Sequence, residues 1–241
     1  GFFSDILRIP RPSKKEEKIA AWLMDLAARR RLSASMSEVG NVVIRKPGTP
    51  GRAYQPAIVL QTHVDMVCEK NSDKIFDFDR DEITALISGE WVTADGTTLG
   101  ADNGIGMAAQ LALLAADTIP HGPLECLFTV DEETGLTGAN ALQPGFISGK
   151  MLINLDSEDE GEIFIGCAGG MDTIATFNYK KEACPADGTA LELTISGLQG
   201  GHSGDDIHKG LGNANKILVR FLALAFEKYG LSLSSIDGGN L

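Results

Sequence analysis

The chain has 241 residues, 43% of them hydrophobic, and a formal net charge of −12. This length and composition allow a large core in one or two domains. The negative charge argues against nucleic acid or an anionic membrane as partner, and it suits a soluble cytoplasmic protein or one that binds cations.

Cysteine usage and the chain ends give further expectations. None of the four cysteines lies in a CxxC pair, which excludes a zinc ribbon and a thioredoxin motif and favours reduced thiols in a reducing compartment. We find neither a signal peptide nor an apolar run of transmembrane length. The chain opens at Gly1 without a Met and stops at Leu241 without a closing element, so we expect a piece of a longer protein. The cysteines are Cys68, Cys126, Cys167 and Cys184.

The first part of the chain predicts one helix and then strands. Apolar residues at helical spacing predict a helix over 14–31, and three arginines at its end suit the helix dipole. Ser13, with Glu16 three residues on, has the spacing of a capping box. Strands are predicted at 36–39 and 41–46, as a hairpin-like pair, and at 57–62, as a continuous buried run.

The buried strand at 57–62 ends in His63-Val-Asp65. Residues two apart on an extended chain share a face, so these two side chains point the same way. A metal-bound histidine usually donates its second ring N–H to a carboxylate, and this pair supplies both parts. Taken alone, such a histidine is more often a hydrogen-bonded structural residue.

A glycine-rich turn at 98–106 contains Asp102 and leads into an Ala/Leu-rich segment, 107–116, that predicts a buried helix. The structural alternative for Asp102 is an N-cap. A phosphate cradle is disfavoured, because the spacing is not that of a P-loop, no lysine follows, and an acid would repel phosphate. An acid at this place suits a cation.

Two more predicted strands end in acids. The apolar run at 124–130 leads into Asp131-Glu-Glu133, three like charges that repel one another unless protons or a cation compensate them. A solvated turn is the alternative for such a triplet. The run at 151–155, predicted as a buried strand, ends at Asp156. A short helix is predicted between these two runs, at 137–142. A further strand is predicted after them, at 161–167.

The acids and His63 therefore all lie at a strand or turn edge next to an apolar segment. Open α/β sheets build their sites at the carboxyl edge of the strands. Brought to one edge, these side chains would form a cluster of the kind that binds Zn²⁺ or Mn²⁺. The cluster consists of His63, Asp102, Glu132, Glu133 and Asp156.

Five motifs of the chain resemble those of the aminoacyl-histidine dipeptidases and occur in the same order along the sequence. These are bacterial cytosolic non-specific dipeptidases of the co-catalytic zinc peptidase clan, which also contains aminoacylases and glutamate carboxypeptidases. The resemblance covers essentially the whole chain. The motifs lie at 61–66, 99–106, 131–135, 154–162 and 200–204, and segments 167–170 and 210–215 resemble the dipeptidase branch in particular.

The resemblance implies an α/β fold with a mixed-sheet α/β/α zinc-peptidase catalytic domain. Residues 1–186 would form the amino-terminal part of this discontinuous domain, and 187–241 the truncated beginning of an inserted α+β lid. Sequence patterns in the second part predict a strand at 190–195, an amphipathic helix from about 207 to 229, and the start of another strand at 231–236.

The resemblance also implies the metal ligands. His63 and Asp156 would bind one zinc, Glu133 the other, and Asp102 would bridge both, with a cis peptide bond after it. Asp65 would orient His63. The last ligand of the second zinc is a histidine near the C-terminus of the full protein, which nothing here matches. The cofactor would be two Zn²⁺ per full-length site, and Co²⁺ or Mn²⁺ would also fit.

The implied reaction is hydrolysis of dipeptides of the Xaa-His type with broad specificity. A hydroxide that bridges the metals would attack, and Glu132 as general base would pass its proton to the leaving amine. His202, in the lid, would donate to the oxyanion. Because the lid histidine of dimeric relatives reaches the partner subunit's active site, a homodimer through the lid is a further expectation.

Two alternatives stay open. One is an aminoacylase, deacetylase or carboxypeptidase of the same clan. The other is a metal-binding fragment, inactive because it lacks the C-terminal histidine ligand.

Overall fold

The computed structural model describes residues 1–157, 159–167, 169, 171, 173–201 and 206–238. The chain forms two compact units, Gly1–Ala168 and Gly169–Leu241. The expected start of a lid domain at residue 187 stays a prediction. Among the described helices, none combines the length and hydropathy needed to cross a lipid bilayer.

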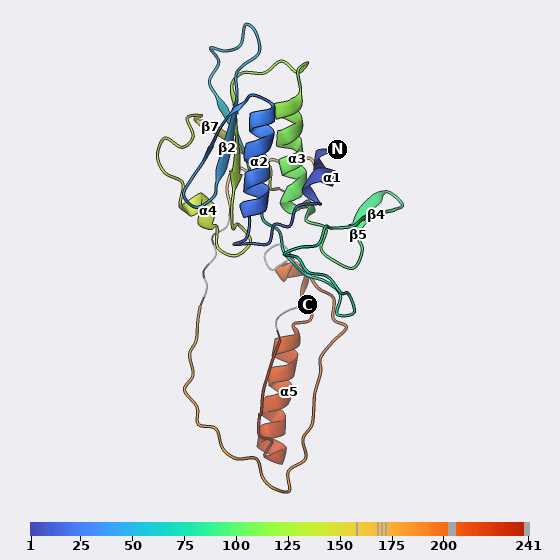
Figure 1. The fold of residues 1–241 in the computed structure, drawn as a ribbon. Coiled ribbons are helices and arrows are strands. Elements are labelled where there is room, and N and C mark those ends of the chain that lie inside the picture. Colours follow the sequence, from blue (N-terminus) through green and yellow to red (C-terminus); the bar gives the residue numbers. More distant parts are fainter. Residues whose placement is uncertain (158, 168, 170, 172, 202–205, 239–241) are drawn as a thin grey trace. The chain divides into compact units, whose positions relative to one another are not determined.

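The first unit is built on a mixed five-stranded sheet, as predicted (Figure 1). Three adjacent strands at one side of the sheet run parallel, and the two strands at the other side are antiparallel to their neighbours. Parallel neighbours end at the same edge, so the segments that follow them meet there. The strands, in sheet order, are β1 (Ser33–Met36), β2 (Val42–Lys46), β6 (Leu124–Thr129), β3 (Ile58–His63) and β7 (Met151–Asn154).

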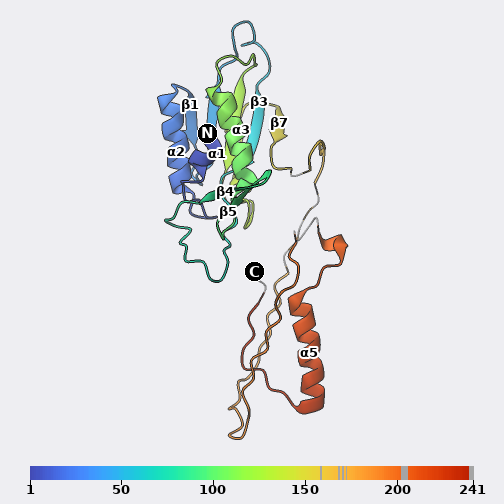
Figure 2. The ribbon, with the colours of Figure 1, turned by 90° about the vertical axis from the view of Figure 1, so that its right-hand side faces the viewer.

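Three helices cover one face of this sheet. They are α1 (Phe2–Ile6), α2 (Glu17–Arg29) and α3 (Ala101–Ala115). Figure 2 shows α2 over the β1 side and α3 over the β3 side. Their apolar stripes bury a common core with the sheet, which removes large apolar side chains from water. This core includes Leu23, Leu111 and Phe128, each fully buried.

The opposite face is covered by the segment after α4 (Thr137–Asn140). There a smaller cluster forms between three sheet residues and three residues of the covering segment. The sheet residues are Val43, Val59 and Leu127, and the covering residues are Leu142, Phe146 and Ile147.

The predicted cap of α2 is wrong. The helix begins at Glu17, with Glu16 as its N-cap residue and no capping bond from a side chain. Lys14 donates its backbone N–H to Glu16 Oε1 at 3.0 Å. The Ser13 hydroxyl instead donates to Asp65 Oδ2 at 2.8 Å, a charge-assisted hydrogen bond to a buried carboxylate.

Several predicted strands differ from the structure. The first hairpin strand lies at 33–36 rather than 36–39, because residues 37–41 form the turn. Between β3 and α3 the chain forms a separate hairpin of two short strands, β4 (Ala85–Ser88) and β5 (Trp91–Ala94). β7 is exposed rather than buried, since among the described residues it pairs on one side only. The described segment 161–167 forms no strand.

The second unit contains one long helix. α5 (Ala214–Tyr229) is capped by Asn213, whose side chain accepts the Lys216 N–H at 2.9 Å. A short 3-10 helix, η1 (Ile207–Lys209), precedes it, so the helix predicted from 207 is interrupted at Gly210, whose φ is +68°. The predicted strands at 190–195 and 231–236 are not formed; neither described segment has a paired neighbour, and a lone strand cannot satisfy its backbone groups.

Candidate metal centre

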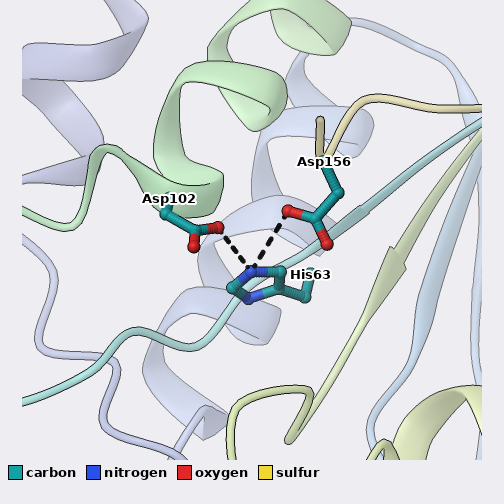
Figure 3. Close-up of side chains that lie close together, drawn as sticks. All are labelled: His63, Asp102 and Asp156. Carbon is teal, nitrogen blue, oxygen red and sulfur yellow. Dashed lines mark hydrogen bonds and ion pairs between the residues drawn. The ribbon is translucent and has the colours of Figure 1, made fainter. Parts of the chain in front are cut away.

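His63 is the last residue of β3 and is 1% exposed. Its Nδ1 lies 3.1 Å from Asp65 Oδ1, and its Nε2 lies 2.9 Å from Asp102 Oδ1 and 3.5 Å from Asp156 Oδ1. Figure 3 shows both aspartates pointing at the same edge of the imidazole. The buried Asp65 carboxylate therefore holds Nδ1, while Nε2 faces the carboxylates of Asp102 and Asp156.

The glycine-rich turn carries Asp102 to this position. Gly100, with φ at +70°, precedes the turn, and the Asp102–Asn103 peptide bond is cis, as the resemblance implied. Asp102 and Asn103 have non-helical φ and ψ, so the regular helix begins at Gly104. Asp102 is not the N-cap residue of the helix, which is Gly100, and this disfavours the N-cap alternative. Its carboxylate is directed at His63 instead.

Asp156 follows β7 after one intervening residue. Its backbone N–H donates to Asn154 Oδ1 at 2.9 Å, and the Asn103 amide donates to its carboxylate. Hydrogen bonds with His63 outweigh the effect of burial and lower the pKa of Asp156. The carboxylate therefore stays ionised beside the imidazole.

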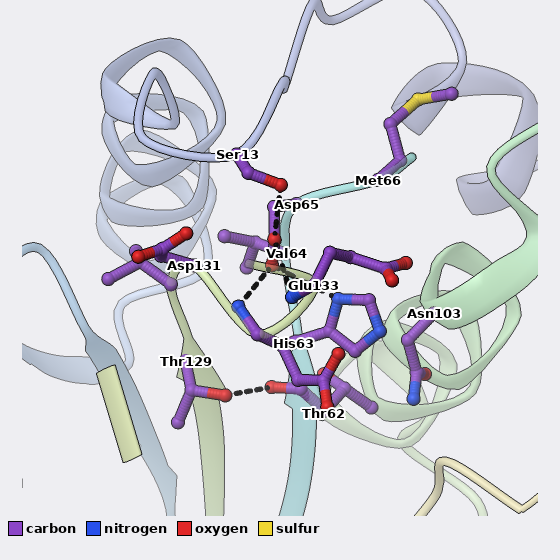
Figure 4. Close-up of polar contacts among 12 residues, drawn as sticks. Ser13, Thr62, His63, Val64, Asp65, Met66, Asn103, Thr129, Asp131 and Glu133 are labelled. Carbon is purple, nitrogen blue, oxygen red and sulfur yellow. Dashed lines mark hydrogen bonds and ion pairs between the residues drawn. The ribbon is translucent and has the colours of Figure 1, made fainter. Parts of the chain in front are cut away.

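The acid turn after β6 is held by Asp65. Glu132 donates its backbone N–H to Asp65 Oδ1 at 3.0 Å, and Glu133 donates its own to Oδ2 at 3.1 Å. Figure 4 shows Ser13 and Glu133 meeting the Asp65 carboxylate from different sides. Although burial acts to raise the pKa of Asp65, these donors and His63 lower it to about 2.

Two groups of side chains have the spacing of a metal site. Ligand atoms of His63, Asp102 and Asp156 lie within 4.8 Å of one another, and so do those of His63, Glu132 and Glu133. One imidazole with several carboxylates is a donor set that suits Zn²⁺ or Mn²⁺. The sequence prediction that these five residues meet at one edge is confirmed.

A third group of acids is a structural network. Glu16, Asp65 and Asp131 are buried together. Glu16 Oε1 accepts backbone N–H groups, and the Asp131 carboxylate accepts the hydroxyls of Thr134 and Thr137. Donors of the protein bond to these carboxylates, which fits a structural network.

The negative charge of the cluster shows in its pKa values. Burial alone would lower the pKa of His63, but hydrogen bonds to Asp102, Asp156 and Asp65 raise it to about 12. Burial, then the charge of Asp102, raises the pKa of Glu133 to about 7. Burial raises the pKa of Glu132 as well. Shifts in this direction are expected where acids crowd together, and a cation would relieve the crowding.

Other residues at this site were not predicted from the sequence. Arg11 is buried beside the cluster, and Asn103 reaches Asp156. Only the two prolines that flank Arg11 marked it in the sequence. Asp131, which had no assigned role, holds the turn through Thr134 and Thr137. His202, the predicted oxyanion donor, lies outside the described residues.

Known proteins share the sequence and the fold. The cytosol non-specific dipeptidase of Escherichia coli is 50% identical over 239 residues, which cover 99% of this chain and 49% of that protein. The crystal structure of the aminoacylhistidine dipeptidase from Vibrio alginolyticus matches with a TM-score of 0.69 and 45% identity, over 95% of this chain and 47% of that one. The resemblance to the aminoacyl-histidine dipeptidases is confirmed.

This chain spans about half the length of these dipeptidases. Aminopeptidase PepT from Bacillus cereus matches less closely, with a TM-score of 0.54 and 27% identity over 65% of this chain and 42% of that one. No protein-family model matches the chain.

Proposed function

We propose that this chain supplies most of the metal centre of a dinuclear zinc dipeptidase that cleaves Xaa-His and related dipeptides. The observation that carries the proposal is the convergence of Asp102 and Asp156 on one edge of the His63 imidazole. Glu132 and Glu133 lie beside the same imidazole. The E. coli relative, named a cytosol non-specific dipeptidase, supports the substrate class and a cytoplasmic location.

In this proposal His63, Asp102 and Asp156 hold one zinc, and Asp102 and Glu133 hold the second. The metals, when bound, supply a Lewis acid for the peptide carbonyl and lower the pKa of the attacking water. Asp65 keeps His63 Nδ1 occupied, so that Nε2 remains the ligand atom. Two zinc ions are proposed because the donor set fits them; Co²⁺ and Mn²⁺ would fit it too.

Glu132 is the proposed general base. It stands beside the ligands, and burial raises its pKa, which makes its carboxylate a better proton acceptor near neutral pH. It would take the proton of the attacking water and deliver it to the leaving amine. Glu133 is committed to metal, so the two adjacent glutamates divide the work. His202 is the proposed donor to the oxyanion.

The remaining parts of the proposal concern partners. The substrate is a dipeptide, and the complete protein would form a homodimer in which the lid domain carries His202. The net charge of −12 supports the view that neither nucleic acid nor an anionic membrane is a partner.

The test measures zinc content and hydrolysis in the complete protein. We expect two zinc ions per subunit, turnover of the Xaa-His dipeptide carnosine, and no turnover of N-acetyl amino acids. Turnover of N-acetyl amino acids alone would point to an acylase instead, and one weak zinc with no turnover would support an inactive metal-binding protein. His63→Ala should lose zinc, whereas His208→Ala, at an exposed position in η1, should keep it.

A further inference from the structure

A buried arginine connects two of the segments that form the site. Arg11 lies between Pro10 and Pro12, in the chain that joins α1 to α2, and it is 1% exposed. Its Nη1 donates to the backbone oxygens of Val64, at 2.9 Å, and Asp65, at 2.8 Å. Its Nη2 donates to the Gly100 oxygen at 2.5 Å. All three acceptors are backbone carbonyls.

These three carbonyls stand next to metal ligands. Val64 follows His63 directly, and Gly100 is two residues before Asp102. The end of β3 and the turn before α3 are far apart in sequence and are held by one planar group. A guanidinium presents its N–H groups in a fixed fork, so it sets the distance and the angle between its acceptors, which a flexible ammonium group does not.

The glycines of the turn leave room for this group. A Cβ at Gly100 would lie 2.5 Å from Arg11 Nη2, and one at Gly104 would lie 3.0 Å from it. The first distance is shorter than real Cβ contacts show, and the second is tighter than most of them. The absence of side chains at these two glycines therefore leaves room for a cation that belongs to the protein.

The charge of Arg11 also acts on the site. Its guanidinium attracts Asp65, Asp102 and Glu133 electrostatically. Burial lowers the pKa of Arg11 to about 10, so it remains charged at neutral pH. A fixed positive charge beneath crowded carboxylates reduces their mutual repulsion before any metal binds.

We propose that Arg11 is a positioning residue of the metal centre, whose fork on the Val64, Asp65 and Gly100 carbonyls sets the spacing of His63 and Asp102. This inference rests on the proposed function only in that a divalent metal binds between these two residues. The hydrogen bonds of Arg11 go to backbone carbonyls and not to the side chains of the ligands. Arg11 acts through the backbone that carries the ligands.

The test compares Arg11→Lys, which keeps the charge but loses the fork, with Arg8→Lys, the same exchange at an exposed position three residues earlier. The complete protein is loaded with Co²⁺, and its affinity is measured by chelator competition together with the visible spectrum. We expect affinity in Arg11→Lys to fall by about tenfold or more, with an altered spectrum and a lower kcat at similar KM. Arg8→Lys should match the parent protein.

A folded Arg11→Lys protein with the parent's Co²⁺ affinity and spectrum would overturn the inference. Because the measured quantity is metal affinity, the result of this test does not depend on which substrate the protein cleaves. A protein whose Co²⁺ affinity depends on Arg11 but which cleaves no dipeptide would contradict the proposed function and leave the role of Arg11 intact.

A second variant covers the case in which Arg11→Lys does not fold. Gly104→Ala keeps the guanidinium but crowds it, and its Cβ also meets Phe3 Cε2 at 3.0 Å. Phe3→Leu/Gly104→Ala removes that ring contact, and Phe3→Leu alone is its control. We expect the double variant to bind Co²⁺ at least threefold more weakly than Phe3→Leu. Equal affinity in these two proteins would contradict the inference.

Discussion

The Asp65 carboxylate accepts the backbone N–H of Glu132 at 3.0 Å. The same oxygen lies 3.1 Å from His63 Nδ1, so one buried acid connects the end of β3 with the turn after β6. These strands are parallel neighbours, with His63 paired to Thr129, so their ends already lie together. Asp65 therefore fixes the imidazole and the acid turn relative to each other, and neither orientation is independent of the other.

Asp65→Asn should disturb both the orientation of the His63 imidazole and the acid turn after β6. The amide keeps the shape of the side chain, but its NH₂ would face an N–H donor where an oxygen now accepts. Loss of such an orienting carboxylate typically costs about 10- to 100-fold in metal affinity or activity. We expect losses of that size in zinc affinity and in kcat of the complete protein. Asp117→Asn, on the exposed surface after α3, is the control. Parent-like values in both measurements would show that the acid is dispensable.

Glu132→Gln and Glu133→Gln should separate the two adjacent glutamates. Glu132→Gln should lower dipeptide turnover by about 100-fold or more, while the bound zinc stays at the parent level, because only proton transfer is lost. Glu133→Gln should lower the zinc content. Metal analysis and kinetics on the same samples decide between the roles. Retained turnover in Glu132→Gln would rule out the base assignment.

Much of the candidate site was predictable from sequence, because each functional side chain lies at a strand or turn edge next to an apolar run. A buried strand ends where its apolar run ends, so His63 and the triplet at Asp131 could be placed at one sheet edge from periodicity and strand order alone. Asp102 was placed the same way, by the Ala/Leu-rich helix behind its turn. Parallel pairing of β3, β6 and β7 then brings these ends together.

The residues that support the site could not be predicted. The Ser13 hydroxyl has the spacing of a capping box, yet it bonds to Asp65, which lies 52 residues away. Arg11 reads as one basic residue among many, and its three acceptors are backbone oxygens without any side-chain signal. Local patterns predict helices and strands, whereas such long-range polar contacts depend on the finished packing. The unformed strand at 190–195 has the same cause, because a strand needs a partner that its own sequence does not specify.

Asp131→Ala should destabilise the acid turn more than Asp131→Asn. Asp131 has a φ of +50°, a conformation that costs most residues about 1–2 kcal/mol but that asparagine tolerates. Alanine also loses the bond from Thr134, which is 2.5 Å long, and the bond from Thr137. We expect the free energy of unfolding to fall by about 2–4 kcal/mol for alanine and by about half as much for asparagine. Urea unfolding in the presence of a chelator, with Asp117→Ala as control, measures this, and equal losses for both variants would refute it.

Glu125 should give the fold a pH dependence that Glu125→Gln removes. Burial alone would raise its pKa, but the N–H groups of Gly149 and Ser148, at 2.9 and 2.7 Å, outweigh it, so the pKa lies below its usual value of 4.5. A carboxylate whose pKa is lower in the folded state contributes its full stabilisation at pH values above its pKa in the unfolded state. This stabilisation is lost as the pH falls through its pKa in the folded state.

Glu125→Gln should therefore cost about 2 kcal/mol of unfolding free energy at pH 7, because the amide supplies one acceptor where two oxygens now accept. The difference from the parent protein should shrink as pH falls from about 5 to 3, where the parent carboxylate becomes protonated. Urea unfolding across this range, with the exposed Glu38→Gln as control, gives both curves. A difference that stays constant with pH would mean that these hydrogen bonds do not favour the ionised form.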